Sequence, residues 1–484
     1  GDGGGGSSST TTPCCDTSNG SGQNGSNASN GSGQTSGSGS ASTGSGGSGP
    51  LPCGDPTTFE SGLTPSAELH VATNGSDGSG DGSAASPFAS IEHAANLATP
   101  GTAVVVHAGT YPGGAYLSDI AGSDGAPIWI GGAPNEQKPH IQGGDNGLHL
   151  SRARYLVIHD LEISGGTANG INTDDGGDYA NEDATRYVVF RGVDIHDIGS
   201  GGNNDCLKLS GVNDFFVLGS SFARCGGGMS GSGIDHVGCH RGVVAFSTFE
   251  EMSGNGVQTK GGSTDIVISA NTFRDGGERA VNIGGSTGFE FFRPPLDPSG
   301  ENAEARRIQV LANVIEGGFA SLAFVGCVDC LAANNTIVDP GRWPFRILQE
   351  TSSGGGYTFA PASNGRVINN IVWYTAAALG AHVNVGGGTD PDSFVFQTNL
   401  WYAHDDPGSS APSLPTPEQG GISGVDPQFV AAGSGDYHLA SGSPAATARS
   451  PSSRAIAMAP STRCRRASAR SRPESMRSRF PSRL

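Results

Sequence analysis

Four short segments between residues 204 and 285 share one pattern, in which an aliphatic residue is followed directly by a polar one. In a β-strand, neighbouring side chains point to opposite faces. The aliphatic members would therefore fill a core, and the polar members would form a column on the outside of the fold. The four pairs are Leu207–Lys208, Ile234–Asp235, Val257–Gln258 and Val281–Asn282. We take this polar column as the candidate functional surface.

The same register extends the polar column in both directions. It adds Asn172 before Lys208, and Ala323 and Arg346 after Asn282. A second column follows on the same face, and a third lies at the preceding turn. The second contains Asp174, Ser210, Val237, Lys260, Gly284, Val325 and Leu348, and the third contains Asn169, Asp205, Ser232, Asn255, Arg279, Ala320 and Trp343. A solvated face with salt-bridged Lys and Asp is the plain alternative to a functional site.

Lysines, carboxylates and arginines on one face suit the β-elimination of a uronic-acid polysaccharide. That reaction needs three things: the sugar carboxylate is neutralised, a base removes the adjacent proton, and the glycosidic oxygen leaves. Ca²⁺ held by carboxylates, or an arginine, can neutralise the sugar. A lysine whose pKa is lowered by burial and nearby cations can act as the base.

These requirements assign a role to each polar residue of the columns. Lys208 and Lys260 are the candidate bases. Ca²⁺ is the one cofactor that the sequence suggests, and its candidate ligands are Asp174, Asp205 and Asp235. Arg279 or Arg346 would clamp the sugar carboxylate. The full set of expected substrate-binding residues is Asn172, Gln258, Arg279, Asn282, Trp343 and Arg346.

Two other functions are compatible with the same residues. A glycoside hydrolase needs two carboxyl groups about 5–5.5 Å or about 6.5–9.5 Å apart, and Asp174 and Asp205 could supply them from adjacent coils. A non-catalytic surface adhesin or glycan-binding protein would instead stack Trp343, Tyr357 and Phe292 on sugar rings. Release of unsaturated uronide would distinguish a lyase from both the hydrolase and the non-catalytic protein.

The segment from Asp235 to His240 also contains residues that bind metals. His236, Cys239 and His240 could ligate Zn²⁺. The register turns His236 inward, however, which favours a core histidine hydrogen-bonded to a neighbour. The nine cysteines form no zinc pattern, and Cys206–Cys225, Cys225–Cys239 or buried thiols are all compatible with the sequence.

A short motif containing Asn recurs along the chain. It appears at Asn271, Asn313, Asn335, Asn370 and Asn399, with Ser, Gly or Asp in earlier copies back to Asp160. The copies are about 30 residues apart on average, which is a period typical of solenoids. Each repeat has short strands and Gly-rich turns but no room for a crossover helix. We predict an all-β solenoid in which the stacked Asn side chains have a structural role.

Composition divides the chain into three parts. Residues 1–66 are rich in Gly, Ser, Thr and Asn, which predicts a disordered tether. Residues 67–446 carry the repeats. Residues 447–484 are rich in Arg and Ser, which predicts a disordered tail, with nucleic-acid binding as the rival interpretation. The interval from Asn271 to Asn313, 42 residues, is the longest and predicts a protruding loop that walls a cleft.

Residues 68–111 hold a strand, a turn-rich loop, a short helix with Ile91, Ala94 and Ala95 on its apolar face, and a second strand. This segment resembles the opening of secreted right-handed parallel β-helix proteins of the pectate-lyase-like superfamily, and residues 125–144 resemble their second coil. The resemblance implies a right-handed parallel β-helix solenoid with an N-terminal capping helix. It also implies a carbohydrate-active protein similar to calcium-dependent polysaccharide lyases, secreted by a bacterium or displayed on its surface.

Charge and hydropathy limit the partners that we expect. The formal net charge is −18, although the tail beyond residue 448 is basic, so the remainder is strongly acidic. An acidic body argues against nucleic acid as the main ligand. No run of about 18 apolar residues exists, which excludes a transmembrane helix from the sequence given. We expect a monomer whose partner is an acidic polysaccharide.

Overall fold

The computed structural model describes residues 56–199, 202–227 and 230–447. The predicted tether over residues 1–55 and the predicted tail beyond residue 447 lie outside this part of the chain. Residues 56–66, which the composition predicted to belong to the tether, pack against the solenoid through Phe59 and Glu60. Phe59 contacts the rings of Tyr155 and Tyr187 edge-on, with centroids 5.6 and 6.1 Å apart. The ordered unit therefore begins before residue 67.

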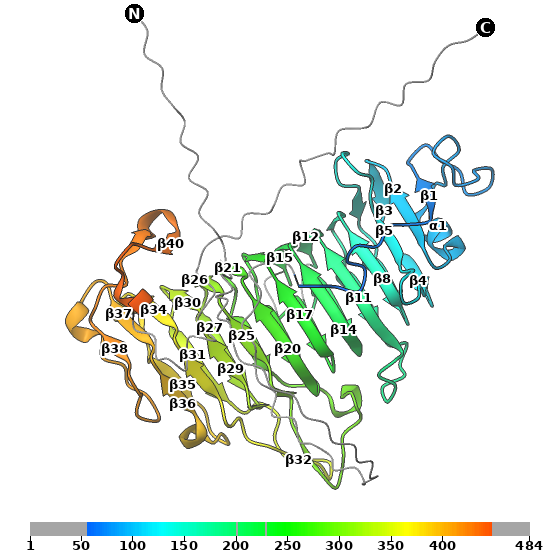
Figure 1. The fold of residues 1–484 in the computed structure, drawn as a ribbon. Coiled ribbons are helices and arrows are strands. Elements are labelled where there is room, and N and C mark those ends of the chain that lie inside the picture. The colour runs from blue at the N-terminus through cyan, green and yellow to red at the C-terminus, as the bar shows by residue number, and fades with distance from the viewer. Residues whose placement is uncertain (1–55, 200–201, 228–229, 448–484) are drawn as a thin grey trace, which may run out of the picture.

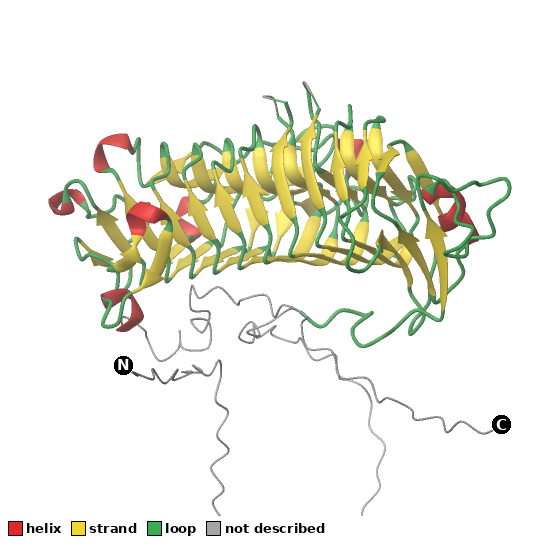
Figure 2. Cartoon of the chain, turned by 90° about the horizontal axis from the view of Figure 1, so that it is seen from above, coloured by secondary structure: helices red, strands yellow, loops and turns green. Residues whose placement is uncertain are grey.

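Three long parallel sheets run along an elongated molecule (Figures 1 and 2). The first sheet contains β1 (Ala67–Val71), β2 (Thr102–Val106), β5 (Ile128–Gly132), β8 (Arg154–His159), β11 (Thr185–Arg191), β14 (Val212–Leu218), β17 (His240–Ala245), β20 (Ser263–Ser269), β24 (Ala305–Arg306), β25 (Gln309–Leu311), β28 (Cys327–Val328), β29 (Leu331–Ala333), β33 (Arg366–Ile368) and β36 (Val395–Gln397).

The second sheet contains β4 (Ala115–Ser118), β7 (Asn146–Ser151), β10 (Asn169–Asp174), β13 (Leu207–Ser210), β16 (Ser232–Val237), β19 (Asn255–Lys260), β22 (Arg279–Gly284), β27 (Ala320–Val325), β31 (Trp343–Leu348) and β35 (Val383–Val385). The third contains β3 (Thr110–Pro112), β6 (His140–Gln142), β9 (Glu162–Ser164), β12 (Asp194–Ile198), β15 (Ser221–Cys225), β18 (Thr248–Glu250), β21 (Thr272–Arg274), β26 (Val314–Glu316), β30 (Thr336–Val338), β34 (Ile371–Tyr374), β37 (Leu400–Ala403) and β38 (Ile422–Ser423).

The remaining elements are short. β23 (Glu301–Asn302) pairs with β32 (Thr358–Phe359), and β39 (Phe429–Ala431) pairs with β40 (Asp436–Leu439). The α-helices are α1 (Ile91–Leu97) and α2 (Pro444–Thr447), and the 3₁₀ turns are η1 (Phe289–Phe291), η2 (Ala376–Ala378), η3 (Pro391–Ser393), η4 (Pro407–Ser409) and η5 (Ala432–Ser434). α1 lies beside the first strands, and its Ile91, Ala94 and Ala95 join the core.

Successive coils add strands to each sheet in turn, so the chain winds as a right-handed parallel β-helix. The aliphatic column predicted from the sequence is the core of the second sheet. Its members, Ile171, Leu207, Ile234, Val257 and Val281, are fully buried. Burial of each such side chain contributes about 1.5–3 kcal/mol, so the alternation of aliphatic and polar residues determines which face of each strand points inward.

The predicted Asn column is a continuous hydrogen-bonded ladder at one turn of the solenoid. The side-chain amide nitrogen of Asn271 donates to Oδ1 of Asn313 at 3.0 Å, and the contact repeats through Asn335 and Asn370 to Asn399. Each Asn follows a residue with left-handed backbone, for example φ = 54° at Ala270. Because that conformation is unfavourable for a residue with a Cβ, the ladder offsets its cost. The structural role predicted for these Asn residues is confirmed.

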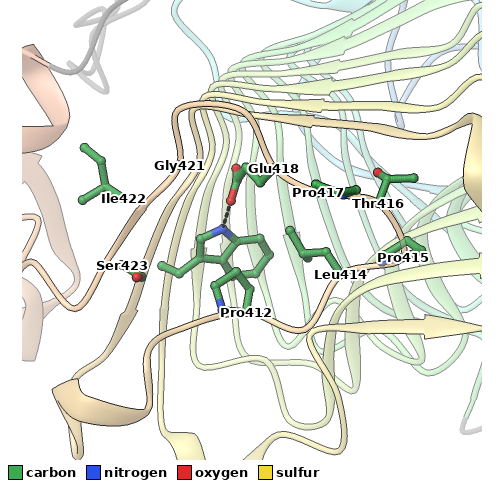
Figure 3. Close-up of a pocket in the computed structure, with 10 residues that line it drawn as sticks. Pro412, Leu414, Pro415, Thr416, Pro417, Glu418, Gly421, Ile422 and Ser423 are labelled. Carbon is green, nitrogen blue, oxygen red and sulfur yellow. Dashed lines mark hydrogen bonds between the residues drawn. The ribbon is translucent and has the colours of Figure 1, made fainter.

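A carboxylate terminates this ladder at the C-terminal end of the stack. Oε1 of Glu418 accepts hydrogen bonds from the backbone and side-chain nitrogens of Asn399, at 2.9 and 2.7 Å. Oε2 accepts from Nε1 of the buried Trp401 at 2.9 Å (Figure 3). The segment from Pro412 to Ser423 carries Glu418 across the end of the coils and encloses a pocket of about 480 Å³.

Two disulfides lie in the solenoid. Cys206 pairs with Cys225, which is one of the pairings that the sequence left open, and Cys327 pairs with Cys330. Cys239 is a buried thiol, and burial raises its pKa to about 12. Among the described residues, no helix is long and apolar enough to cross a bilayer.

Replacing Glu418 by Gln tests the terminal acceptor of the ladder. Glutamine has one acceptor oxygen, so its NH₂ group would meet either the Asn399 donors or the Trp401 donor. We expect the free energy of unfolding to fall by about 1–3 kcal/mol, measured by chemical denaturation. The control Glu250→Gln removes an exposed pair with Arg274 and should change it by less than about 1 kcal/mol. Equal stability of Glu418→Gln and the parent would contradict this role.

Candidate functional site

The polar column predicted from the sequence exists in the second sheet. Strand pairing aligns Asn172 with Lys208, Lys208 with Asp235, Asp235 with Gln258, and Gln258 with Asn282. The column continues through Ala323 and Arg346 to Asn384. In the other direction it includes His149 and Tyr116.

His149 and Tyr116 were missed from the sequence, although a signal for them is present. Leu148–His149 and Ala115–Tyr116 repeat the pattern of an aliphatic residue before a polar or aromatic one. Extending the register by two more coils would have found both.

A groove of about 690 Å³ opens over the N-terminal half of this sheet. Its floor carries Asn172, Lys208 and Lys260, and two loops form its walls. One loop follows β10, and the other is the insertion after β22, which includes Thr287 and Phe291. The prediction that the longest interval between Asn motifs supplies a wall is confirmed.

A buried ion pair joins the two walls. Nε of Arg293 lies 2.5 Å from Oδ2 of Asp175, and both side chains are almost completely buried. The guanidinium also lies over the ring of Tyr179, 4.0 Å from its centroid. At the base of the insertion, the buried Glu304 accepts hydrogen bonds from Thr287 and from the backbone N–H of Gly261. The wall is therefore a fixed part of the groove.

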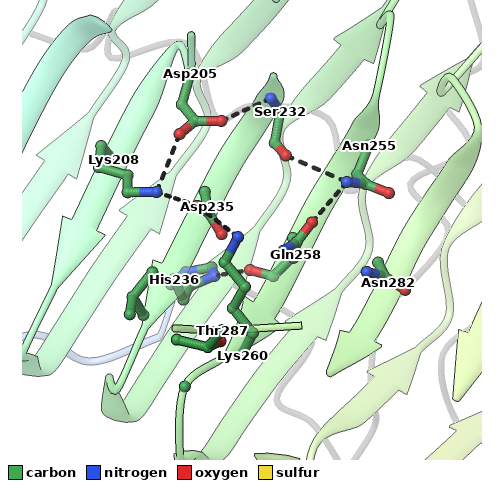
Figure 4. A network of polar contacts seen from close by, with 12 residues as sticks. Asp205, Lys208, Ser232, Asp235, His236, Asn255, Gln258, Lys260, Asn282 and Thr287 are labelled. Atoms are coloured by element: carbon green, nitrogen blue, oxygen red, sulfur yellow. Dashed lines mark hydrogen bonds and ion pairs between the residues drawn. The ribbon is translucent and has the colours of Figure 1, made fainter. Parts of the chain in front are cut away.

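Two lysines and two aspartates form an ion cluster in the floor (Figure 4). Nζ of Lys208 contacts Oδ2 of Asp235 and lies 3.3 Å from Oδ2 of Asp205. Nζ of Lys260 lies 3.3 Å from the same Asp235 oxygen. Both carboxylates are only 1% exposed, whereas the lysine side chains are 18% and 13% exposed. The lysine side chains are thus the more exposed part of the cluster.

The cluster shifts the protonation of its members. Burial lowers the pKa of Lys208, but Asp235 and Asp205 raise it above its ordinary value overall. Burial raises the pKa of Asp205 more than Lys208 lowers it. For Asp235, Lys208 and Lys260 outweigh burial and lower the pKa. Lys208 is therefore held as a cation, which disagrees with its predicted role as a base.

A second polar cluster lies at the N-terminal side of the groove. Nε2 of His149 lies 2.6 Å from Oδ2 of Asp174. Asp174 also accepts hydrogen bonds from Ser151 Oγ at 2.8 Å, the backbone N–H of Gly176 at 2.9 Å and Nδ2 of Asn172 at 3.0 Å. Burial raises the pKa of Asp174, but these contacts reverse that effect and lower it to about 2.

The predicted substrate-binding residues Gln258 and Asn282 do not line the groove. Both side chains are buried. Oε1 of Gln258 accepts from Asn255 at 2.6 Å, and Oδ1 of Asn282 accepts from Arg279 at 3.1 Å. The pairing also shifts by one residue after Gln258, so Gly284 aligns with Thr259 and not with Lys260 as predicted.

Arg279, Trp343 and Arg346 lie outside the groove as well. Arg279 pairs with Glu350 at 2.5 Å. Nε of Arg346 donates to Asn384 at 3.0 Å, and its guanidinium lies 4.3 Å from the centroid of Trp343. Five strand spacings, about 24 Å, separate Arg346 from Lys208 in the sheet. Neither arginine can clamp a carboxylate beside Lys208 in this arrangement.

The three predicted Ca²⁺ ligands do not converge. Asp205 and Asp235 contact the lysines, whereas Asp174 lies level with Ser210, five residues beyond the level of Asp205. At 3.3 Å per residue this separation is about 17 Å. No group of three or more His, Cys, Asp and Glu residues that could hold a metal is found in the described part of the chain. The same main-chain separation does not favour the hydrolase alternative, whose Asp174–Asp205 carboxyl groups would have to lie within about 9.5 Å.

His236 points inward, as its register predicted. Nδ1 contacts the backbone oxygen of Gln258 at 2.8 Å, and the ring packs beside Phe215. Burial lowers the pKa of His236 to about 4. The interpretation as a core histidine is confirmed, and a zinc site with Cys239 and His240 is not formed.

Replacing Arg293 by Met tests whether the buried pair holds the wall. The change leaves Asp175 buried without its partner, which costs about 3–5 kcal/mol. We expect a loss of that size in denaturant unfolding, together with faster proteolysis of the insertion. The control Arg307→Met removes an exposed pair with Asp265 and should cost less than about 1 kcal/mol. A loss no larger for Arg293 than for Arg307 would show that the wall does not depend on this contact.

The buried His236 makes stability depend on pH. Its pKa is about 4 in the folded chain and about 6.5 when unfolded. Below pH 6.5 the unfolded state binds the proton more readily, so stability falls as the pH drops from 6.5 to 4, by up to about 3 kcal/mol. His236→Gln should lose less stability over this range than the parent. His240 is present in both proteins, so identical losses would refute the contribution of His236.

The chain is similar to known proteins in a family model and in solved structures. Residues 146–293 match the family model described as a right handed beta helix region, and a search of curated protein sequences finds no match. Solved structures with a similar fold include a pectate lyase (16% identity over 79% of this chain and 92% of that one, TM-score 0.49). A second is a lacto-N-biosidase from Eubacterium ramulus (14% identity over 69% of this chain and 67% of that one, TM-score 0.46). A third is an alginate lyase from Paenibacillus sp. (16% identity over 74% of this chain and 99% of that one, TM-score 0.41). From its sheets and the family match, the chain is a right-handed parallel β-helix protein.

Proposed function

We propose that the chain binds an acidic, uronate-containing polysaccharide in the groove and cleaves it by β-elimination. The observation that carries the proposal is the layering of the ion cluster. The side chains of Lys208 and Lys260 line the groove and are partly exposed, whereas the carboxylates that hold their ammonium groups are buried. An approaching ligand therefore meets cations first.

The protonation of the cluster strengthens this attraction. Burial raises the pKa of Asp205 to about 6, so this group begins to lose its negative charge just below neutral pH, where an exposed aspartate stays ionised. Below about pH 6 the two lysines therefore face one largely ionised carboxylate, Asp235. The surplus of positive charge favours a sugar carboxylate over a neutral sugar.

The rims of the groove suit a sugar chain. Tyr116 and Phe291 both line it, and each is 47% exposed, which is unusual among the large apolar side chains of this protein. Exposed aromatic rings offer flat surfaces on which sugar rings can stack. Phe291 takes the place that the sequence had suggested for its neighbour Phe292, which is buried.

In this proposal Lys208 and Lys260 neutralise the uronate carboxylate. Neutralisation acidifies the neighbouring C–H, which is the first requirement of β-elimination. An ammonium that stays protonated suits this role better than the role of base. Two cations already face the sugar carboxylate, so the proposal needs no Ca²⁺ for this step.

The two disulfides fit an oxidising location, which supports action outside the cell.

Incubation with polygalacturonate, alginate and chondroitin, with and without a chelator, tests the proposal. We expect one of these glycans to release unsaturated uronide, followed by ultraviolet absorbance, and the rate to survive chelation. Binding without this absorbance would favour the non-catalytic adhesin. Loss of activity on chelation, restored by Ca²⁺, would show that a metal neutralises the sugar instead.

Lys260→Met tests the cationic floor, because Asp235 keeps Lys208 as a partner in this variant. We expect the affinity for the acidic glycan to fall about 10–100-fold, the size of a lost hydrogen bond to a charged group, in titration calorimetry. Lys138→Met, which removes an ion pair with Asp194 on the third sheet, should leave the affinity unchanged. An unchanged affinity of Lys260→Met for the acidic glycan would show that Lys260 does not contribute to binding and would contradict the proposed cationic floor.

A further inference from the structure

His149 is a histidine in the groove that the neutralisation of the sugar does not use. It lies on β7 in the same outward column as Lys208, with Asn172 between them. Its side chain is 30% exposed, so it is accessible to a ligand. Tyr116, on the next strand, packs edge-on against it with ring centroids 4.8 Å apart.

One ring nitrogen of His149 is fixed by a carboxylate. The 2.6 Å contact between Nε2 and Asp174 Oδ2 places the N–H on that nitrogen. Asp174 is itself held by Ser151, Asn172 and Gly176, so its position is determined on every side. The other nitrogen, Nδ1, then has its lone pair available, and no described residue is found to donate a hydrogen bond to it.

The spacing between His149 and Lys208 leaves room for a single sugar over Asn172. Two strand spacings, about 10 Å, separate His149 from Lys208 in the column. The ammonium of Lys208 leans away from His149, toward Asp205 and Asp235. A uronate ring placed over Asn172 would have its carboxylate toward the ammonium groups and its ring protons toward the imidazole.

We infer that His149, oriented by Asp174, is the base that removes the proton next to the uronate carboxylate. The inference rests on the proposed β-elimination. Nδ1 of His149 takes the C5 proton, and the electron pair of the C5–H bond forms the C4–C5 double bond. The C4–O bond breaks with its electron pair on the glycosidic oxygen, which takes a proton from water in the open groove. No oxidant or further reactant is needed.

This assignment gives the two sides of the groove different tasks. The lysines are ion-paired cations that bind the carboxylate, and His149 presents Nδ1 to the sugar while its Nε2 contacts Asp174. The charged groups around His149 are Asp174 and, further along the wall, Arg152, which is paired with Asp119 at 2.6 Å. Asp174 is a positioning residue, because its part in this step is to orient His149.

The test measures kcat and affinity of the full chain and of His149→Ala on whichever uronate polymer the parent cleaves. We expect kcat to fall about 10²–10⁴-fold and the affinity to change by less than about threefold. Added imidazole should restore part of the lost rate, because it can occupy the vacated space and accept the proton. His149→Gln keeps an N–H that can donate to Asp174, and we expect it to be as slow as His149→Ala. A loss of rate in the glutamine variant would then not result from a structure disturbed by the loss of that contact.

His196→Ala is the matched control. That histidine is exposed to a similar extent (28%), contacts Asp197 at 2.6 Å, and lies on the third sheet away from the groove. It should keep the parent rate. Asp174→Asn should lower kcat with little change in affinity, and imidazole should not restore its rate.

Several outcomes would overturn the inference. If His149→Ala keeps kcat within threefold of the parent, the base lies elsewhere, and the proposed lyase activity still stands. If its affinity falls as much as kcat and imidazole restores nothing, His149 binds the sugar only. If a Lys260→Ala variant is restored by a primary amine, the base is a lysine. If the parent cleaves no uronate polymer, the proposed function fails and this inference fails with it.

Discussion

The arrangement of the groove depends on one constraint, the in-register stacking of parallel strands. Each coil places its outward residue directly beside that of the next coil, as the pairing of Asn172, Lys208 and Asp235 shows. A slip of one residue would turn Lys208 and Asp235 into the core and Leu207 and Ile234 into solvent. The buried aliphatic column therefore determines which polar groups meet, and the Asn ladder, which ends at Glu418, fixes the turn from which each coil starts.

Burial of the two carboxylates in the ion cluster costs free energy. Two buried carboxylates must be separated from water, and replacement of such a cluster by apolar residues is often neutral or stabilising. Oδ1 of Asp235 and Oδ2 of Asp205 are buried without a hydrogen bond, although Lys208 lies 3.3 Å from the latter. A cluster arranged for stability alone would satisfy these atoms. Its position below an open groove fits a role in binding charged ligands better.

Much of the fold and part of the site could be predicted from the sequence. Alternation of aliphatic and polar residues is local, so it placed Lys208, Asp235 and Lys260 on one face, and the long interval after Asn271 indicated a wall. Some of the contacts that hold residues away from the groove are not local. Glu350, 71 residues from Arg279, pairs with it, and Arg293 finds Asp175 across 118 residues. The repeat does not encode such distant pairs, so Arg279 was predicted to line a surface that it does not reach. Gln258 and Asn282 have partners three residues away, Asn255 and Arg279, but the alternation of aliphatic and polar residues does not show that their side chains are buried.

A crystal structure of the chain with a bound oligouronide tests the central claim most directly. The account predicts one sugar over Asn172, its carboxylate within hydrogen-bonding distance of Lys208 or Lys260, and its C5 atom next to His149. An oligomer seated elsewhere, such as the pocket beside Trp401, would contradict the account. So would a sugar in the groove whose carboxylate points away from both lysines.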